Sequence, residues 1–415
     1  MCMCSFCIYG QNETNAKAQD KGKGKVAAKK SEYKRSAVVK EFRTMMKATN
    51  YSKAKDAIDN AMKKHEEAKE DAQLYKLKVD ALNELIRTEN RKIYLNQKPD
   101  TTAFFNFMID LYETGLMCDS IERSTLEKRQ YGKAVAEKML PLRKNLLSAG
   151  KYFYNKDYAK SFQFIDLYVN TKNADVFALP NGNTMVNDED DMVNTASIAV
   201  LSAYASSNYH GVMKYLPDAL NDKKLEGTFL EIGSKSAAAV GDTVEMVNLL
   251  ENGFAFYPQQ IYFFMTLVKY YNGQSDYARA LEKCDKMVEL YPDNRDYWFM
   301  KAKEEMFLEK YNEAIVSFDK CLNIKADDAE AYSNKGNVYL IQAHEMYSSF
   351  NLKLNDPKYN EKKAQLNSVY TKAKDAYEGA RKFAENRKEL WIDGLREIYF
   401  KLNKGKELRN LEKYK

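Results

Sequence analysis

Apolar residues along this chain recur with the three- and four-residue spacing of amphipathic helices. Ala54, Ile58 and Ala61 follow this spacing and predict one helix. Residues 72–96 and 101–118 follow it over longer stretches and predict two long amphipathic helices. Composition agrees, because the 415 residues include only 7 Pro and 17 Gly and are rich in straight-chain side chains that lose little rotamer freedom in a helix. The sequence therefore predicts an all-α protein.

In the second half of the chain the helical pattern repeats every 34 residues. Tyr277 and Ala280 recur as Tyr311 and Ala314 on the second helix of each unit. The preceding helix of each unit carries a large residue at its fourth position and a small one at its eighth. The large residues are Leu230, Phe264, Trp298 and Tyr332, and the small ones are Val200, Ser234, Val268, Ala302 and Gly336. A small side chain lets the two helices approach closely, and stacked pairs bury apolar stripes that no single pair can bury.

The spacing resembles the tetratricopeptide repeat (TPR), which has an aromatic residue at position 4, a small one at 8, Tyr at 11 and 17, Ala at 20 and Pro at 32. Residues 261–294 and 295–328 match this pattern best, whereas 193–226 and 227–260 keep the register with fewer consensus residues. The unit that starts at residue 329 is interrupted by an insertion. The resemblance implies a right-handed superhelical solenoid of antiparallel helix pairs.

The register and its interruptions predict five parts of the chain. They are a signal-like segment with a disordered Lys-rich linker (1–32), N-terminal TPR-like hairpins (33–170), an inserted acidic loop (171–192), a TPR array (193–385) and a C-terminal capping helix with a tail (386–415). In the last part, Trp391 belongs to an amphipathic helix. We expect its side chain to point inward, so that this helix covers the last apolar face of the solenoid.

The first ten residues, MCMCSFCIYG, are largely apolar and are followed by polar sequence. They resemble the second half of a secretory signal peptide without its basic n-region. One hypothesis is a truncated start, which would make the protein periplasmic or exported; otherwise it is cytoplasmic. Residues 12–32 are rich in Lys, Gly and Ala without a hydrophobic period, so we expect a disordered linker there. No later stretch has the roughly 18 apolar residues of a membrane span.

Charge and candidate chemistry narrow the function further. The 65 basic and 59 acidic residues give a net charge of +6, which indicates a solvated exterior rather than the dense basic stripe of a nucleic-acid binder. His65, His210 and His344 are the only histidines, and none has a second His at helical spacing. The sequence contains no Gly-rich phosphate loop and no G-x-S-x-G motif. We therefore expect no catalytic residue, cofactor, metal or nucleic-acid partner, and a protein that is not an enzyme.

Two groups of residues have competing interpretations. The Cys spacing does not match a zinc site, so Cys118, Cys284 and Cys321 are expected to be buried free thiols. The acidic run at residues 188–191 could hold Ca²⁺, but it lacks the spaced ligands of an EF-hand. We favour a role at the start of the following helix, because acidic side chains there complement the helix dipole.

The resemblance also implies a binding face. In TPR proteins, positions 2, 5, 9, 12 and 13 of the first helices line a concave groove that takes extended or helical peptides. The corresponding groove residues here are Lys235, Tyr262, Met265, Lys269, Phe299, Lys303 and Asn337. The three lysines share position 9, and they would form a basic stripe suited to an acidic or C-terminal peptide segment. The alternative is that they are ordinary solvated lysines.

Chaperone-binding TPR proteins clamp a peptide carboxylate with Lys, Asn and Arg side chains at set positions. The equivalent positions here carry Met265, Lys269, Met300, Glu330 and Asn334, so the resemblance implies no such clamp. The sequence thus predicts a non-enzymatic protein–protein interaction scaffold that holds a protein or peptide segment of unknown identity. The alternative is a cell-envelope component that recognises glycans or surface ligands through some of the 30 Tyr rings.

Overall fold

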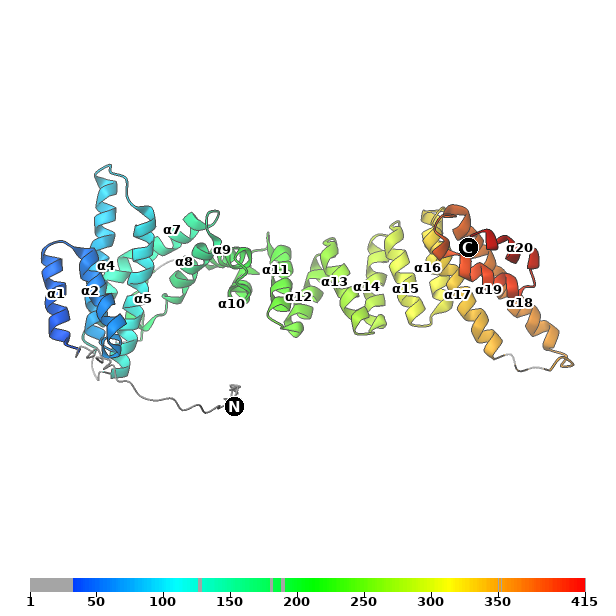
Figure 1. Cartoon of the computed structure of the whole chain (residues 1–415), viewed down its shortest axis with the longest axis horizontal. Coiled ribbons are helices and arrows are strands. Elements are labelled where there is room, and N and C mark those ends of the chain that lie inside the picture. The colour runs from blue at the N-terminus through cyan, green and yellow to red at the C-terminus, as the bar shows by residue number, and fades with distance from the viewer. Residues whose placement is uncertain are drawn as a thin grey trace, which may run out of the picture. The chain divides into compact units, whose positions relative to one another are not determined.

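The computed structural model describes most of the chain as helices joined by short turns (Figure 1). The described residues are 33–125, 129–179, 182–187, 191–349, 351 and 353–414. Within them, one isolated antiparallel bridge between Ala178 and Thr184 is the sole β-type pairing. The predicted all-α array of helix pairs is confirmed. The predicted signal-like segment and linker, and the acidic residues 188–190, lie outside the described residues.

The chain divides into two compact units. The first contains the described residues up to Leu142 together with Ala174–Met185, and the second contains Arg143–Asn173 together with Val186–Lys415. The segment predicted as an inserted loop therefore contributes residues to both units. The five-part division predicted from the sequence stays a prediction.

The first unit is built around two long helices. Its elements are α1 (Arg35–Lys47), α2 (Tyr51–Lys64), α3 (Glu66–Lys69), α4 (Ala72–Tyr94), α5 (Thr101–Thr125), α6 (Gly132–Met139) and the 3-10 turns η1 (Leu140–Leu142) and η2 (Asp175–Phe177). The predicted helix with Ala54, Ile58 and Ala61 is α2, and all three side chains are buried. The two predicted long helices are α4 and α5, of which α5 continues further than expected. Phe177 of η2 is buried, so this part of the predicted loop contributes to the core.

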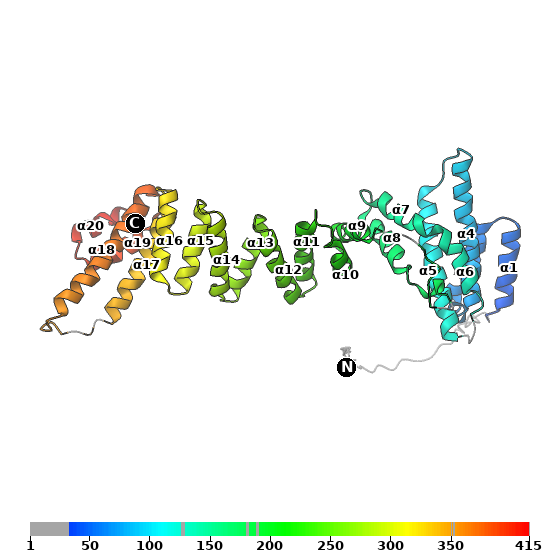
Figure 2. The same ribbon diagram turned by 180° about the vertical axis from the view of Figure 1, so that it is seen from behind.

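The second unit consists of consecutive helix pairs. They are α7 (Arg143–Phe153) and α8 (Tyr158–Asn170), α9 (Met192–Ala205) and α10 (Tyr209–Ala219), α11 (Glu226–Ala239) and α12 (Thr243–Phe256), α13 (Ile261–Gly273) and α14 (Tyr277–Leu290), α15 (Arg295–Phe307) and α16 (Tyr311–Ile324), and α17 (Ala329–Ser348) and α18 (Tyr359–Phe383). The C-terminal elements are η3 (Lys388–Leu390), α19 (Ile392–Lys401), α20 (Gly405–Asn410) and η4 (Glu412–Tyr414). Both views show α11 to α16 side by side in chain order (Figures 1 and 2). The second helices α10, α12, α14 and α16 begin 34 residues apart, which confirms the register.

Small residues allow the two helices of a pair to approach, as the sequence predicts. Val200, Val268 and Ala302 are buried at the eighth position of their units. At the same position of the next unit, a Cβ on Gly336 would lie 2.9 Å from the ring of Tyr377. Any larger residue there must therefore displace the ring from the neighbouring helix.

The turn between paired helices has a recurring backbone conformation. Ser207, Gly241, Ser275 and Glu309, which are 34 residues apart, have φ angles of +59°, +82°, +57° and +59°. In each turn the next backbone N–H reaches back five residues; Asp276 N, for example, donates to Tyr271 O at 2.9 Å. This is the Schellman arrangement, which satisfies carbonyls at a helix C-terminus and needs one left-handed residue. Only one of the four residues is the glycine that this conformation favours.

The C-terminal end of the second unit has its own apolar cluster. Trp391 is 1% exposed, and its indole N–H donates to Ala384 O at 3.1 Å, so its predicted inward orientation is confirmed. The cluster contains Tyr370 and Tyr377 from α18 and Leu395 from α19, so α19 covers the apolar side of the last long pair. The predicted buried free thiols Cys118, Cys284 and Cys321 are confirmed, and burial raises the pKa of each thiol.

Candidate functional site

The predicted groove residues lie on the first helices of four consecutive pairs. We define the first-helix face as Lys235 of α11, Tyr262, Met265 and Lys269 of α13, Phe299 and Lys303 of α15, and Asn337 of α17. Because these helices share the 34-residue register, the three lysines and Asn337 occupy equivalent places on successive helices. Their side chains nevertheless differ in what they contact.

Lys235 and Tyr262 are brought together between α11 and α13. The Lys235 Nζ lies 4.7 Å from the centroid of the Tyr262 ring, and the Tyr262 hydroxyl lies 3.0 Å from Ser234 Oγ. The same Nζ donates to Glu231 Oε1 at 2.5 Å, and this hydrogen bond raises the pKa of the Lys235 ammonium. Lys235 is therefore a partly neutralised cation stacked on an aromatic ring.

The middle of the first-helix face is the most open. Met265 is 47% exposed, and Lys269, one helical turn further on, is also exposed. Among the described residues, Lys269 has no ion-pair partner, so its charge faces solvent. On the next helix the Lys303 Nζ lies 5.4 Å from the centroid of the Phe307 ring.

We add Phe307 of α15 to the first-helix face, although the groove residues predicted from the sequence do not include it. Its side chain is 49% exposed although it is a large aromatic residue. It occupies position 13 of its unit, which is one of the groove positions in TPR proteins, so the register itself carried the signal. The open part of the face thus combines two cations with two apolar groups.

Phe299 and Asn337 are largely engaged within the protein. The Phe299 ring meets the Phe318 ring edge-on at 5.7 Å and lies under the Arg295 guanidinium at 4.3 Å. Asn337 accepts a hydrogen bond from the Tyr377 hydroxyl of α18. These two predicted groove residues therefore hold helices together and leave less of their surface for a ligand.

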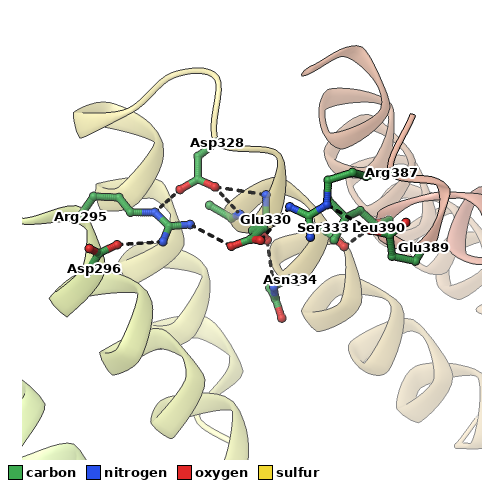
Figure 3. A network of polar contacts seen from close by, with 10 residues as sticks. Arg295, Asp296, Asp328, Glu330, Ser333, Asn334, Arg387, Glu389 and Leu390 are labelled. Carbon is green, nitrogen blue, oxygen red and sulfur yellow. Dashed lines mark hydrogen bonds and ion pairs between the residues drawn. The ribbon is translucent and has the colours of Figure 1, made fainter. Parts of the chain in front are cut away.

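A polar network lies at the N-terminal ends of α15 and α17 (Figure 3). Arg295 pairs with Asp328, whose Oδ1 accepts the backbone N–H groups of Glu330 and Ala331 at 3.1 Å. The Glu330 carboxylate in turn lies 2.8 Å from the Arg387 guanidinium. The network thus ties α15, α17 and the segment before α19 to one another.

The charges in this network compensate each other internally. Burial alone would raise the pKa of Asp328, but hydrogen bonds from Arg295 and from the Ala331 N–H outweigh it and hold the pKa below its ordinary value. Asn334 donates to the Glu330 carbonyl at 2.9 Å rather than facing outward. Glu330 and Asn334, which stand where clamp-type TPR proteins bind a carboxylate, therefore serve the packing of the array.

No three His, Cys, Asp or Glu side chains of the described residues come together as metal ligands would. Within the same residues, no helix combines the length and the apolar character needed to cross a bilayer.

Comparisons with known proteins add structural likenesses at low identity. No protein-family model and no curated protein matches the sequence. A crystal structure of MamA is 15% identical, covers 46% of this chain and 88% of its own, and has a TM-score of 0.35. MamA from Desulfovibrio magneticus RS-1 is 10% identical, covers 48% and 99%, and has a TM-score of 0.32. The TPR2AB domain of yeast Sti1, solved as a complex with pHSP90, is 12% identical, covers 63% and 98%, and has a TM-score of 0.26.

Proposed function

We propose that this protein is a non-enzymatic interaction scaffold whose first-helix face holds a segment of a partner protein. The observation that carries the proposal is the open middle of that face, where Met265, Lys269, Lys303 and Phe307 project from two successive first helices. Lys269 is exposed and Lys303 is half-buried, and a partner segment that pairs with these cations would also cover the exposed apolar side chains beside them.

The chemistry of this face indicates the kind of segment that it fits. Lys269 and Lys303 attract carboxylates, whether of acidic side chains or of a chain terminus. Met265 and Phe307 offer apolar surface to a neighbouring aliphatic or aromatic side chain, and the flexible thioether adapts to different shapes. An acidic peptide segment that carries at least one large apolar residue meets both requirements.

A peptide-binding experiment tests the proposal. Fluorescence anisotropy would measure binding of labelled peptides that share one large apolar residue and differ in the number of Glu residues. We expect affinity to rise with the number of Glu residues, and the Lys269→Glu/Lys303→Glu variant to lose roughly tenfold or more, since each exposed ion pair contributes up to about 1 kcal/mol. Unchanged helicity in circular dichroism would show that the variant is folded.

The matched control reverses two exposed lysines on second helices. Lys286 of α14 and Lys362 of α18 are exposed and lie outside the first-helix face. The Lys286→Glu/Lys362→Glu variant changes the net charge by the same amount and should bind as the parent protein does. Equal losses in the two variants would mean that peptides respond only to overall charge, and the proposed face would then be abandoned.

The glycan-binding alternative depends on exposed Tyr rings. Many Tyr side chains are instead buried between helices; they include Tyr112, Tyr168, Tyr215, Tyr271, Tyr370, Tyr377 and Tyr399. The strongly exposed rings, such as Tyr94 and Tyr347, come from separate elements. Sugar recognition usually uses rings that converge on one platform, so the scaffold proposal is the better supported of the two.

A further inference from the structure

The hairpin of α4 and α5 extends beyond the other helices of the first unit. The helix α4 has 23 residues and α2 has 14, which at 1.5 Å per residue corresponds to lengths of about 34 and about 21 Å. Figure 1 shows the loop between α4 and α5 past the ends of α1 and α2. The last buried residue of α4 is Glu89, so the end of α4 beyond this residue lies outside the packed core.

This free end carries three consecutive large apolar residues. Ile93, Tyr94 and Leu95 are 56%, 88% and 59% exposed. Successive residues of a helix point about 100° apart, so these side chains surround the helix end instead of forming one stripe. A partner protein that packs on one side of the helix would leave part of this surface in water.

The other arm of the hairpin adds aromatic surface next to the loop. Phe104 and Phe105 lie near the start of α5, and both are only partly buried. Their rings meet edge-on at 5.3 Å. We call residues 91–105 the α4–α5 tip.

Cations flank this apolar surface, and the two nearby acids, Glu89 and Asp100, make contacts within the hairpin. Glu89 binds the Lys92 ammonium at 2.7 Å and accepts the Asp100 backbone N–H at 2.7 Å. The Asp100 carboxylate accepts the Ala103 N–H at 2.9 Å, at the start of α5. Arg91 and Lys98 are exposed and, among the described residues, have no ion-pair partner.

We propose that the α4–α5 tip docks on an anionic phospholipid bilayer. Ile93, Tyr94 and Leu95 enter the boundary between headgroups and acyl chains, a medium that surrounds the helix end from all sides. Arg91 and Lys98 stay at the level of the lipid phosphates, where long basic side chains extend from an apolar environment to the interface. The tip lies in the interface and does not cross the bilayer. This proposal is independent of the first-helix face.

Tryptophan fluorescence of the full chain tests the insertion directly. The Tyr94→Trp variant would be mixed with vesicles of phosphatidylcholine alone and with vesicles that also contain phosphatidylglycerol, an anionic lipid that attracts basic segments. With the anionic vesicles we expect the emission of the variant to shift to the blue, and to be quenched by brominated acyl chains, beyond any change in the parent protein, which contains two Trp. Neutralising both cations, by Arg91→Gln and Lys98→Gln, should weaken binding to these vesicles by roughly fivefold per cation and change little with neutral lipid. A Tyr94→Trp spectrum that anionic vesicles leave unchanged would overturn the proposal.

Vesicle sedimentation with matched variants locates the contact. The apolar end is removed in the triple variant Ile93→Ser/Tyr94→Ser/Leu95→Ser. We expect the amount of vesicle-bound protein to fall by roughly tenfold or more. The control replaces three other strongly exposed apolar residues, Val244, Leu354 and Phe400, with Ser; binding should persist. Equal losses in both variants would overturn the proposal. So would a vesicle-free dimer that only the tip variant converts to monomer in analytical ultracentrifugation, because the tip would then bind a second copy.

Discussion

The neighbouring pairs α13/α14 and α15/α16 share one register but have different interiors. The helix α13 buries an almost continuous apolar side, made by Phe263, Phe264, Leu267, Val268 and Tyr271. The helix α15 buries Ala302 together with two carboxylates, those of Glu304 and Glu305. The repeat therefore requires a small residue at its eighth position and a close second helix, while the rest of the interior can be apolar or polar.

In the second of these pairs, polar contacts accompany an apolar cluster that includes Ala302, Ala314 and Phe318. Glu305 accepts the Ser317 hydroxyl at 2.6 Å, and Glu304 accepts the Asn272 amide at 2.8 Å. Burial raises the pKa of both carboxyls. Buried charges gain little over apolar packing, since desolvation offsets their attraction. We therefore expect α15/α16 to be the less stable pair, and substitutions at five positions test this comparison.

The largest effect is expected from removing an aromatic ring of the apolar pair. Phe263 is fully buried, and its ring packs so closely on α12 that a Cβ on Gly253 would lie 2.2 Å from it. Phe263→Ala should lower the free energy of unfolding by about 3–5 kcal/mol. Phe299→Ala, at a half-buried ring of α15, should cost about 1–2 kcal/mol. Denaturant unfolding measures both values, and equal losses would contradict the proposed difference between the interiors.

A smaller effect, this time an increase in the free energy of unfolding, is expected from neutralising Glu304. Its Oε2 and the Asn272 Oδ1 are both buried without a hydrogen-bond partner among the described residues. Glu304→Gln places an N–H donor on this side chain and removes a buried charge. We expect the variant to be more stable at pH 7 by about 1–3 kcal/mol, the cost of an unsatisfied buried group.

The pH dependence of stability gives this prediction its control. Because burial raises the pKa of Glu304, the folded protein keeps the proton to a higher pH than the unfolded chain does. The stability that protonated Glu304 contributes is fully present at a pH below the ordinary Glu pKa of 4.5. It is lost as the pH rises through the pKa of Glu304 in the folded protein. Thermal unfolding from pH 4 to pH 8 should show the parent protein losing stability relative to Glu304→Gln over that window. Parallel curves would mean that Glu304 does not titrate differently on folding.

The smallest effect concerns the turns of the two pairs. Asp276 caps α14 by accepting the Arg279 N–H at 3.2 Å, whereas Lys310 at the equivalent position before α16 makes no side-chain cap. Lys310→Asp should stabilise the protein by about 1 kcal/mol, and Asp276→Ala should destabilise it by a similar amount. Hydrogen exchange of the α16 and α14 amides measures each change locally, and a gain from Lys310→Ala equal to that from Lys310→Asp would exclude capping as the cause.

Much of the fold could be predicted because burial leaves a periodic pattern in the residue types. Ala280 and Ala314 occupy the same position in the two units that match the repeat best, so their spacing is visible in a single sequence. The left-handed turns are a contrary case, since Ser207, Ser275 and Glu309 are ordinary residues in a conformation that favours glycine. There the hydrogen bonds of the helix end and the packing of the pair determine the backbone, and the residue type carries no signal.

The candidate site, too, was predictable from the sequence only in part. The 34-residue register was enough to place Lys235, Lys269 and Lys303 on equivalent positions of successive helices. The i,i+4 spacing of Glu231 and Lys235 allows an ion pair, but only the structure shows that Glu231 neutralises Lys235. The sequence also carried no sign that Phe299 and Asn337 pack within the protein or that the α4–α5 tip extends beyond its neighbours.

By itself, then, the sequence determined the all-α class and the 34-residue register of helix pairs in the second unit, because these depend on the periodicity of apolar and small residues along the chain. Only the tertiary structure decided which charges are compensated, which groove positions remain open and which apolar residues are left exposed. Those properties depend on side chains that meet from helices distant in sequence, such as Tyr377 with Asn337, and no local pattern records such meetings.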